Sequence, residues 1–250
     1  MENLHIDNYT VSSYHADFSQ KMSPIALFCF LQESAWRHAD SKGFGWRHLA
    51  EKQQFWVLAK VHAIIHRMPN WTEEIRLETW GKQPELLTAF RDFELFDHDN
   101  KTVISATSSW HILDMLSHRP TATKDFADRF PIIDRYAIDK KPEKISIPAT
   151  DAIQGNVFAV KPSDIDMNQH VNNTRYVQWA MDEIPFDFQK THRLSEIDVN
   201  FVKEAMIENH CYIKTYQQDT LFTQVIFDTN EDKILSMVKS KWAEITDNEQ

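Results

Sequence analysis

Apolar and polar residues in the first half of the chain follow an extended pattern, then a helical one, then an extended one again. Alternation from Tyr9 to Ala16 predicts an opening strand. Ser23-Pro24 provides an N-cap and a proline at the first helical position, and the predicted helix ends at Gly43. Its apolar face comprises Leu27, Phe28, Leu31, Ala35 and His38. Strand-like runs are predicted near 55–67, 74–83, 86–97 and 102–114.

The same order of patterns returns in the second half of the chain. It predicts a strand over 156–162, a helix over 172–184, and extended runs near 195–207, 209–218, 220–228 and 233–246. Val61-His62-Ala63-Ile64 matches Val199-Asn200-Phe201-Val202, and Ser108-Ser109-Trp110 matches Ser240-Lys241-Trp242. The runs alone indicate an α+β protein with antiparallel sheets, built from two similar parts.

A segment without periodic pattern separates the two parts. Residues 116–155 are rich in charge and contain Pro120, Pro131, Pro142 and Pro148. Such a stretch is typical of a linker or of a segment that wraps a domain. We therefore predict an N-terminal domain over 1–115, a linker over 116–155 and a C-terminal domain over 156–250.

The most polar segment of the second half lies between its first strand and its helix. Two aspartates, three asparagines and a histidine occur within residues 164–173. Asn172 or Asn173 is expected to cap the helix, which would place this cluster at the helix N-terminus. The unpaired N–H groups there, and their partial positive charge, suit a carbonyl oxygen that becomes anionic.

This segment resembles the signature of a known enzyme family. Asp166-Met167-Asn168-Gln169-His170-Val171-Asn172-Asn173 followed by Tyr176 is similar to the motif of the acyl-ACP thioesterases. Further segments resemble the first helix and the strands of that family: 31–35, 38–44, 56–62, 69–71 and 77–80. The resemblance therefore covers most of the chain.

The resemblance implies two tandem hotdog domains, each an antiparallel β-sheet wrapped around a long α-helix. It implies hydrolysis of the thioester of fatty acyl-acyl carrier protein, which releases free fatty acid and ends chain elongation. The N-terminal domain would supply the acyl-chain pocket and the C-terminal domain the catalytic residues. The expected partner is an acyl carrier protein that carries the acyl chain on phosphopantetheine, and no metal or organic cofactor is expected.

The resemblance also assigns the catalytic residues Asp166, Asn168, His170 and Glu204. The Asn168 amide can orient the carbonyl or the water, and the His170 imidazole can hold a proton near neutral pH. Asp166 can fix the orientation of either side chain. Glu204, expected at the end of a strand, would be the general base if an apolar pocket raises its proton affinity. Whether Asp166 or Glu204 is the base stays open.

The chain departs from the plant members of the family directly after this glutamate. Those members commonly have a cysteine there, whereas this chain has Ala205. A cysteine–histidine mechanism is therefore excluded at this position, and water activated by Glu204 is the better hypothesis. Glu33 on the first predicted helix is expected to be structural. His62 and His66, about 13 Å apart in a strand, are too distant to chelate a metal as a pair.

Composition excludes several other classes. The formal charge of −10 argues against general affinity for nucleic acid or anionic membranes, and it would also oppose an acidic carrier protein unless a basic patch exists. The chain has only four glycines, and they form none of the glycine motifs of a nucleophile elbow, a P-loop or a Rossmann dinucleotide site. Cys29 and Cys211 are expected to be buried free thiols. The N-terminal residues resemble no signal peptide, so a cytoplasmic location is expected.

Three rival functions remain open at this point. An acyl-CoA thioesterase with the same fold would differ only in the carrier of the acyl chain. A hotdog dehydratase would use a histidine with an acid on the helix, and the asparagine-rich loop disfavours it. A non-enzymatic acyl-thioester sensor would not need to keep a water-activating base. The sequence leaves chain length and oligomeric state open, and a homodimer is possible.

Overall fold

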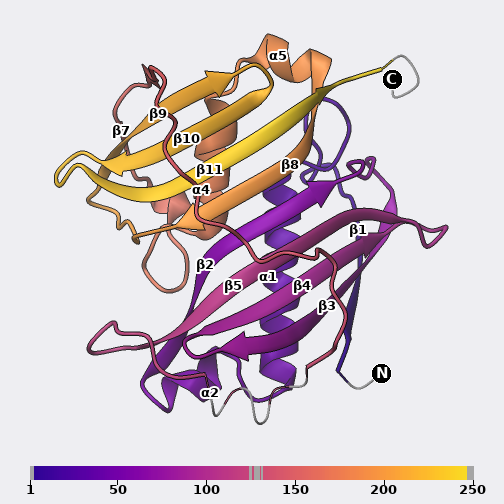
Figure 1. Ribbon diagram of the computed structural model, residues 1–250, viewed down its shortest axis with the longest axis vertical. Coiled ribbons are helices and arrows are strands. Elements are labelled where there is room, and N and C mark those ends of the chain that lie inside the picture. Colours follow the sequence, from indigo (N-terminus) through magenta and orange to yellow (C-terminus); the bar gives the residue numbers. More distant parts are fainter. Residues whose placement is uncertain (1–2, 124–125, 127–129, 131, 247–250) are drawn as a thin grey trace. The chain divides into compact units, whose positions relative to one another are not determined.

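The computed structural model describes residues 3–123, 126, 130 and 132–246, and it divides into two compact units, Met1–Pro142 and Glu143–Gln250. Each unit combines one antiparallel sheet with helices on one of its faces (Figure 1). The α+β class predicted from the pattern is therefore confirmed. The boundary lies at Pro142, so residues 116–142 belong to the first unit.

The first unit has five strands in the order β1-β3-β4-β5-β2. They are β1 (His5–Thr10), β2 (Gln54–Ile65), β3 (Glu74–Glu85), β4 (Thr88–Phe96) and β5 (Thr102–Asp114). Helix α1 (Pro24–Ser41) crosses one face of this sheet, and the short helix α2 (Trp46–Ala50) precedes β2 (Figure 1). The predicted strands after the helix agree with these elements within a few residues at each end.

Helix α1 begins and ends where local chemistry requires it. The Ser23 hydroxyl accepts a hydrogen bond from the backbone N–H of Ala26 at 3.2 Å, and Pro24 follows at the first helical position. Gly43 has a φ of 76°, and the N–H of Phe44 donates to the carbonyl of Ala39 at 2.8 Å. This left-handed residue closes the helix, as glycine allows without strain.

Two expectations for the first unit are wrong. The opening strand ends at Thr10, and Tyr14 is 81% exposed, because residues 12–22 form a loop bonded to residues 69–71. Cys29 is exposed, since it lies on the outward face of α1, opposite Leu27 and Leu31 in the core. Apolar neighbours in the sequence therefore do not bury a helical residue that lies on the opposite face of the helix.

The segment after β5 packs on the first unit. Phe126 and Phe130 belong to a buried cluster with Phe44, Leu49 and Ile112. The guanidinium of Arg135 bonds the carboxylates of Glu78 and Glu94 and lies 4.3 Å from the Trp80 ring centroid. The described residues of 116–142 thus wrap the sheet rather than merely connect the units.

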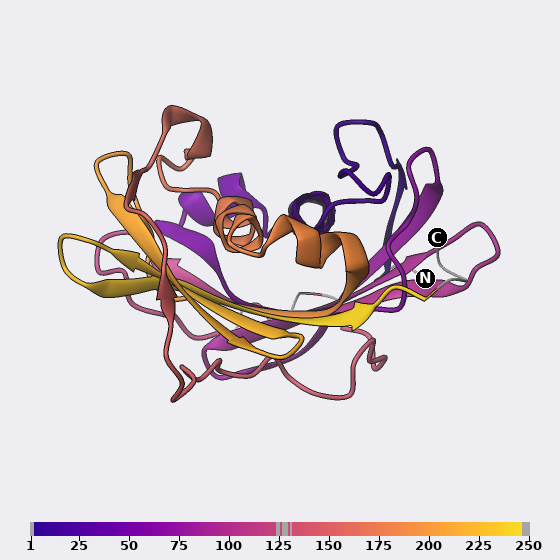
Figure 2. The ribbon, with the colours of Figure 1, turned by 90° about the horizontal axis from the view of Figure 1, so that it is seen from above.

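The second unit has six strands: five follow in the order β8-β11-β10-β9-β6, and the sixth, β7, also pairs with β9. They are β6 (Ile153–Gln154), β7 (Phe158–Ala159), β8 (His192–Phe201), β9 (His210–Gln218), β10 (Leu221–Asp228) and β11 (Lys233–Glu244). A 3₁₀ turn, η1 (Pro162–Asp164), precedes α4 (Asn173–Asp182), and α5 (Phe186–Thr191) follows it. Both α helices lie on the same side of this sheet (Figure 2).

Three details of the second unit differ from prediction. The strand expected over 156–162 is reduced to the two residues of β7, because η1 begins at Pro162. The run expected over 195–207 ends as a strand at Phe201, so Glu204 lies in the loop that follows. Helix α5 was not predicted. Its six residues are too few for a clear periodic signal.

The internal repeat exists, but one predicted match is displaced by two residues. Trp110 donates to the Ser108 hydroxyl at 2.8 Å, and Trp242 donates to the Ser240 hydroxyl at 3.0 Å, so these segments do correspond. Ser108 pairs with Val61, however, whereas Ser240 pairs with Ile197. Val61 therefore corresponds to Ile197 and not to Val199.

Among the described residues, none of the helices combines the length and apolar character of a membrane crossing.

Candidate active site

The polar loop of the second unit is a tight turn between η1 and α4. Ile165 and Val171 form an isolated antiparallel bridge, and the N–H of Asp166 donates to the carbonyl of His170 at 2.8 Å. Gln169 has a φ of 66°, which reverses the chain. This closure fixes the backbone on both sides of His170.

Asp166 shapes this turn directly. Its Oδ1 accepts a hydrogen bond from the backbone N–H of Asn168 at 2.7 Å, the arrangement of an Asx-turn. The Asn168 side chain is exposed, and no hydrogen bond from it reaches another described residue. Asp166 is thus bonded to the backbone of its own loop, and the Asn168 amide remains available to a ligand.

A second loop, between β8 and β9, lies against the first. The N–H of Val171 donates to the carbonyl of Ala205 at 2.8 Å. The N–H of Ala205 donates in turn to the phenol oxygen of Tyr176 on α4 at 3.0 Å. Ala205 is fully buried, so the loop that carries Glu204 is anchored to both the polar turn and the helix.

These anchors bring His170 and Glu204 together. The His170 Nδ1 lies 3.4 Å from the Glu204 Oε2, and their side chains are 23% and 38% exposed. Glu204 is therefore open to solvent. The apolar pocket that was expected around its carboxylate is not found in the described part of the chain. The pair combines a carboxylate that can accept a proton from water with an imidazole that can pass a proton on.

Tyr176 appears in the sequence only as the last residue of the motif, and no role was predicted for its hydroxyl. It is 2% exposed, and burial raises the pKa of its phenol, to which the nearby carboxylates Glu204 and Asp166 add. The hydroxyl therefore stays protonated while its oxygen accepts the Ala205 N–H. A tyrosine within a helical stripe of aliphatic residues was the available signal for this role.

The helix start agrees with prediction. Asn172 is the N-cap of α4, and its Oδ1 accepts hydrogen bonds from the backbone N–H and the hydroxyl of Thr174 at 3.0 and 2.8 Å. Asp164 holds η1 through the N–H of Lys161 at 2.8 Å and lies 3.7 Å from the Arg175 guanidinium. Asp164 is thus a turn residue.

The described cysteines take no part in this arrangement. Cys211 is buried on β9, and burial raises the pKa of its thiol to about 12, an effect strengthened by Asp228 and Asp164. A thiol that stays protonated at neutral pH is a poor nucleophile. With Ala205 beside Glu204, water is the nucleophile that the site supports.

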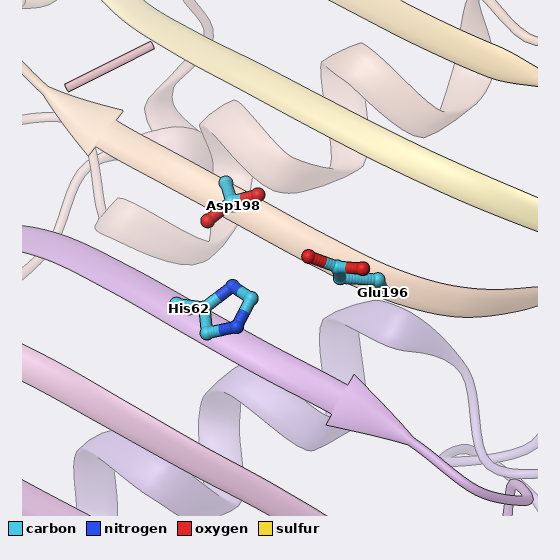
Figure 3. A group of neighbouring side chains, drawn as sticks. All are labelled: His62, Glu196 and Asp198. Atoms are coloured by element: carbon cyan, nitrogen blue, oxygen red, sulfur yellow. The ribbon is translucent and has the colours of Figure 1, made fainter. Parts of the chain in front are cut away.

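Other titratable residues have separate settings. Glu33 is exposed on α1 and forms an ion pair with Arg37 at 2.8 Å, which fits its expected structural role. Figure 3 shows three side chains of the types that bind metals: His62, Glu196 and Asp198. His62 is buried in β2 of the first unit, and Glu196 and Asp198 lie two residues apart on β8 of the second. Neither unit by itself supplies more than two of these three side chains, fewer than a closed metal site requires.

Two family models match the chain. The acyl-ACP thioesterase N-terminal domain matches residues 2–130, and the acyl-ACP thioesterase C-terminal domain matches residues 148–244. The chloroplastic oleoyl-acyl carrier protein thioesterases 2 and 1 of Arabidopsis thaliana are 27% and 29% identical over 221 and 220 residues. Each alignment covers 80% of this chain, and the chain spans 59% and 60% of these relatives.

Solved structures show the same fold over nearly the whole chain. An acyl-ACP thioesterase from Bacteroides thetaiotaomicron aligns with a TM-score of 0.88 at 22% identity, covering 96% of this chain and 98% of the other. The 12:0-ACP thioesterase from Umbellularia californica aligns with a TM-score of 0.85 at 21% identity, covering 97% and 98%. The predicted pair of hotdog domains is thus confirmed as the fold. Since the two family models together match far more than half of its length, the chain belongs to the acyl-ACP thioesterase family.

Proposed function

We propose that this protein hydrolyses the thioester of fatty acyl-acyl carrier protein and releases the free fatty acid. The observation that carries the proposal is the His170–Glu204 pair, held by hydrogen bonds between two loops in a chain of this family. The substrate would be a fatty acyl chain on the phosphopantetheine of the carrier protein. The names of two relatives specify oleoyl-acyl carrier protein. Hydrolysis at this point would end chain elongation.

In the proposed reaction Glu204 is the general base. Its carboxylate accepts a proton from water, and the water oxygen attacks the thioester carbonyl carbon. The amide of Asn168 donates to the carbonyl oxygen while that oxygen carries negative charge. When the C–S bond breaks, the proton passes from Glu204 through His170 to the leaving sulfur, which departs as a thiol.

The contacts of the two acids favour Glu204 over Asp166 as the base. The Asp166 carboxylate accepts the N–H of Asn168 within its own turn, whereas the Glu204 carboxylate faces the imidazole. Asp166 would therefore position Asn168 rather than take a proton from water. Tyr176 would position Glu204 through Ala205.

The test is release of fatty acid from a panel of acyl-carrier proteins and matched acyl-coenzyme A thioesters by the purified protein. Faster hydrolysis of the carrier-protein thioesters supports the proposal and reveals the preferred chain length. Preference for coenzyme A thioesters would make the chain an acyl-CoA thioesterase, and tight binding without hydrolysis would make it an acyl-thioester sensor.

We also propose that the first unit supplies the acyl-chain pocket and the second unit the chemistry. The support is that the described candidate catalytic side chains all lie after residue 143. An acyl thioester with a photoreactive chain terminus should label peptides from residues 1–142, and labelling confined to the second unit would refute this division.

A cytoplasmic location and a homodimer stay predictions. Cell fractionation tests the first and light scattering the second.

A further inference from the structure

The first unit contains a turn that repeats the polar turn of the second unit. The N–H of Asp17 donates to the carbonyl of Lys21 at 2.9 Å, and the N–H of Gln20 donates to the carbonyl of Asp17 at 3.0 Å. Asp17 Oδ1 accepts the N–H of Ser19 at 2.8 Å, and Gln20 has a φ of 59°. The turn around His170 has the same three hydrogen bonds and a glutamine with positive φ at the same place.

The loop that follows β2 likewise begins as the loop that follows β8 does. The N–H groups of residues 66–67 both donate to the carbonyl of Val103 on β5, at 3.0 and 3.3 Å. Those of residues 202–203 both donate to the carbonyl of Leu235 on β11, at 2.9 and 3.1 Å. The two loops therefore leave their sheets with the same backbone geometry.

The two loops also end alike. The N–H of Asn70 donates to the Glu73 carboxylate at 2.9 Å, and the N–H of Glu73 returns to the carbonyl of Asn70 at 3.1 Å. In the second unit Met206 donates to the Asn209 side chain at 2.7 Å, and Asn209 returns to the carbonyl of Met206 at 3.1 Å. The loops thus correspond residue by residue from their first hydrogen bond to their last.

The turn and the loop of the first unit are joined as they are in the second. The N–H of Met22 donates to the carbonyl of Pro69 at 2.8 Å, the length of the bond that joins the two loops of the candidate active site. Lys21 directly precedes Met22, and Met68 directly precedes Pro69. These two side chains therefore stand where the second unit has its imidazole and its carboxylate.

One difference between the units follows from the chemistry of proline. In the second unit the N–H of Ala205 needs an acceptor and finds it in the hydroxyl of Tyr176. The corresponding Pro69 has no N–H, and the corresponding helix position is the fully buried Leu27, which has no hydroxyl. The first unit thus lacks both members of that bond, and its loop keeps its place without it.

The side chains of this second turn cannot perform the proposed hydrolysis. The Lys21 ammonium has hydrogens to donate but no lone pair to accept one, and the Met68 thioether is only a weak acceptor. Both side chains are half-buried, so they are accessible at the surface of the unit. What the first unit lacks is therefore the acid and the base, whereas it retains the backbone that would hold them.

We propose that residues 17–22 and 66–73 form a second site for acyl thioesters, complete in its backbone and silenced by Lys21 and Met68. The inference rests on the proposed function, because it takes His170 and Glu204 as the hydrolytic pair. An imidazole and a carboxylate at the two positions would restore the reaction. The carboxylate would take a proton from water, the water oxygen would bond to the thioester carbon, and the sulfur would leave with that proton as a thiol.

The test restores the pair in a chain whose own site is disabled. The background is Glu204→Gln with His170→Ala, and Lys21→His with Met68→Glu are added to it. Hydrolysis of butyryl-N-acetylcysteamine, which needs neither a carrier protein nor a long acyl pocket, should rise about tenfold or more above the background. The matched control has Met68→Gln in place of Met68→Glu. Its amide has the same shape but accepts no proton, so its rate should stay at the background.

NMR titration of the introduced imidazole tests the geometry without catalysis. Its pKa should be higher with Met68→Glu than with Met68→Gln, because a carboxylate beside it favours the imidazolium. Equal pKa values would mean that the loops do not bring the two positions together, which would overturn the proposal. If urea unfolding shows that Met68→Glu prevents folding, Met68→Asp with Lys21→His provides the same two readouts.

The two proposals fail in different ways. If the natural chain hydrolyses no thioester, the hydrolase function is refuted and the second site is refuted with it. If the natural chain hydrolyses acyl-carrier protein while the restored pair stays at the background rate, the second site alone is refuted.

Discussion

The Nδ1 atom of His170 lies 3.4 Å from the Oε2 atom of Glu204, although 33 residues of sequence separate them. Their loops are joined by the hydrogen bond from Val171 to Ala205, and Ala205 is joined to Tyr176 on α4. A carboxylate and an imidazole placed in this way can share one proton, so the two side chains are expected to act as a unit.

Glu204→Gln should lower kcat by about 10²- to 10⁴-fold with little change in KM, because the amide cannot accept a proton from water. The double variant with His170→Ala should be hardly slower than the slower single variant, since the pair acts together. Steady-state kinetics on acyl-carrier protein measure both. Glu208→Gln, an exposed acid of the same loop, is the matched control. A near-normal rate for Glu204→Gln would remove Glu204 from the mechanism.

Tyr176→Phe should destabilise the protein by about 1–3 kcal/mol, because the buried N–H of Ala205 loses its acceptor. It should also lower kcat, since the Glu204 loop would lose its anchor on α4. Urea unfolding and kinetics measure the two effects. Tyr216→Phe is the control, because no described residue bonds that hydroxyl; equal effects of the two variants would contradict the anchoring role.

Asp92→Asn should destabilise the first unit by about 3–5 kcal/mol. Lys82 Nζ lies 2.8 Å from Asp92 Oδ1, and both side chains are buried, so the variant leaves a buried ammonium without its counter-charge. The double variant Lys82→Met with Asp92→Leu should recover much of the loss. Denaturant unfolding of both variants checks this, and a double variant no more stable than Asp92→Asn would show that other contacts dominate.

The protein should lose stability as the pH falls below about 6.5, in part because of His38. Burial lowers the pKa of His38 to about 2, with further lowering by Arg91, His5 and Lys42. Its Nδ1 lies 3.0 Å from Arg91 Nη1. Below pH 6.5 the unfolded chain binds a proton that the folded chain refuses, which costs up to about 1.4 kcal/mol per pH unit. Unfolding at pH 7, 6 and 5 should show a shallower decline for His38→Gln; an unchanged decline would contradict this.

One thiol per folded chain should react with a maleimide at neutral pH. Cys29 is exposed on α1, whereas Cys211 is buried and its pKa is raised to about 12. Mass spectrometry after brief labelling should find the label on Cys29 and none on Cys211, and unfolding in urea should expose both. Labelling of Cys211 in the folded protein would contradict its burial.

The sequence predicted most elements of the fold because their signals are local. Ser23-Pro24 and Gly43 bound α1, and Asn172 caps α4, each through contacts within a few residues. The alternation of apolar and polar residues along a strand likewise indicates that one face of the sheet is buried. The predictions failed where the local pattern was weak. The opening strand was extended too far, to include Tyr14, and the short helix α5 was not predicted.

The candidate site was recognisable only in part. Asp166, Asn168, His170 and Glu204 were named from family resemblance, and the proximity of His170 to Glu204 depended on how the loops pack. The sequence contained no sign that Asp166 bonds the backbone of Asn168, and the tyrosine at position 176 did not indicate which backbone group its hydroxyl would bond. The repeat was also visible, yet its register was misjudged by two residues, because strand pairing is set by partners far along the chain.

By itself the sequence therefore determined the class of the fold, the caps of its long helices and the residue types available for chemistry. The tertiary structure decided which of these residues meet. Helix caps and strand alternation depend on neighbours within a few positions, so a linear pattern records them. The distance between His170 and Glu204 and the exposure of Cys29 depend on segments that approach only when the chain is packed, and no local pattern records that approach.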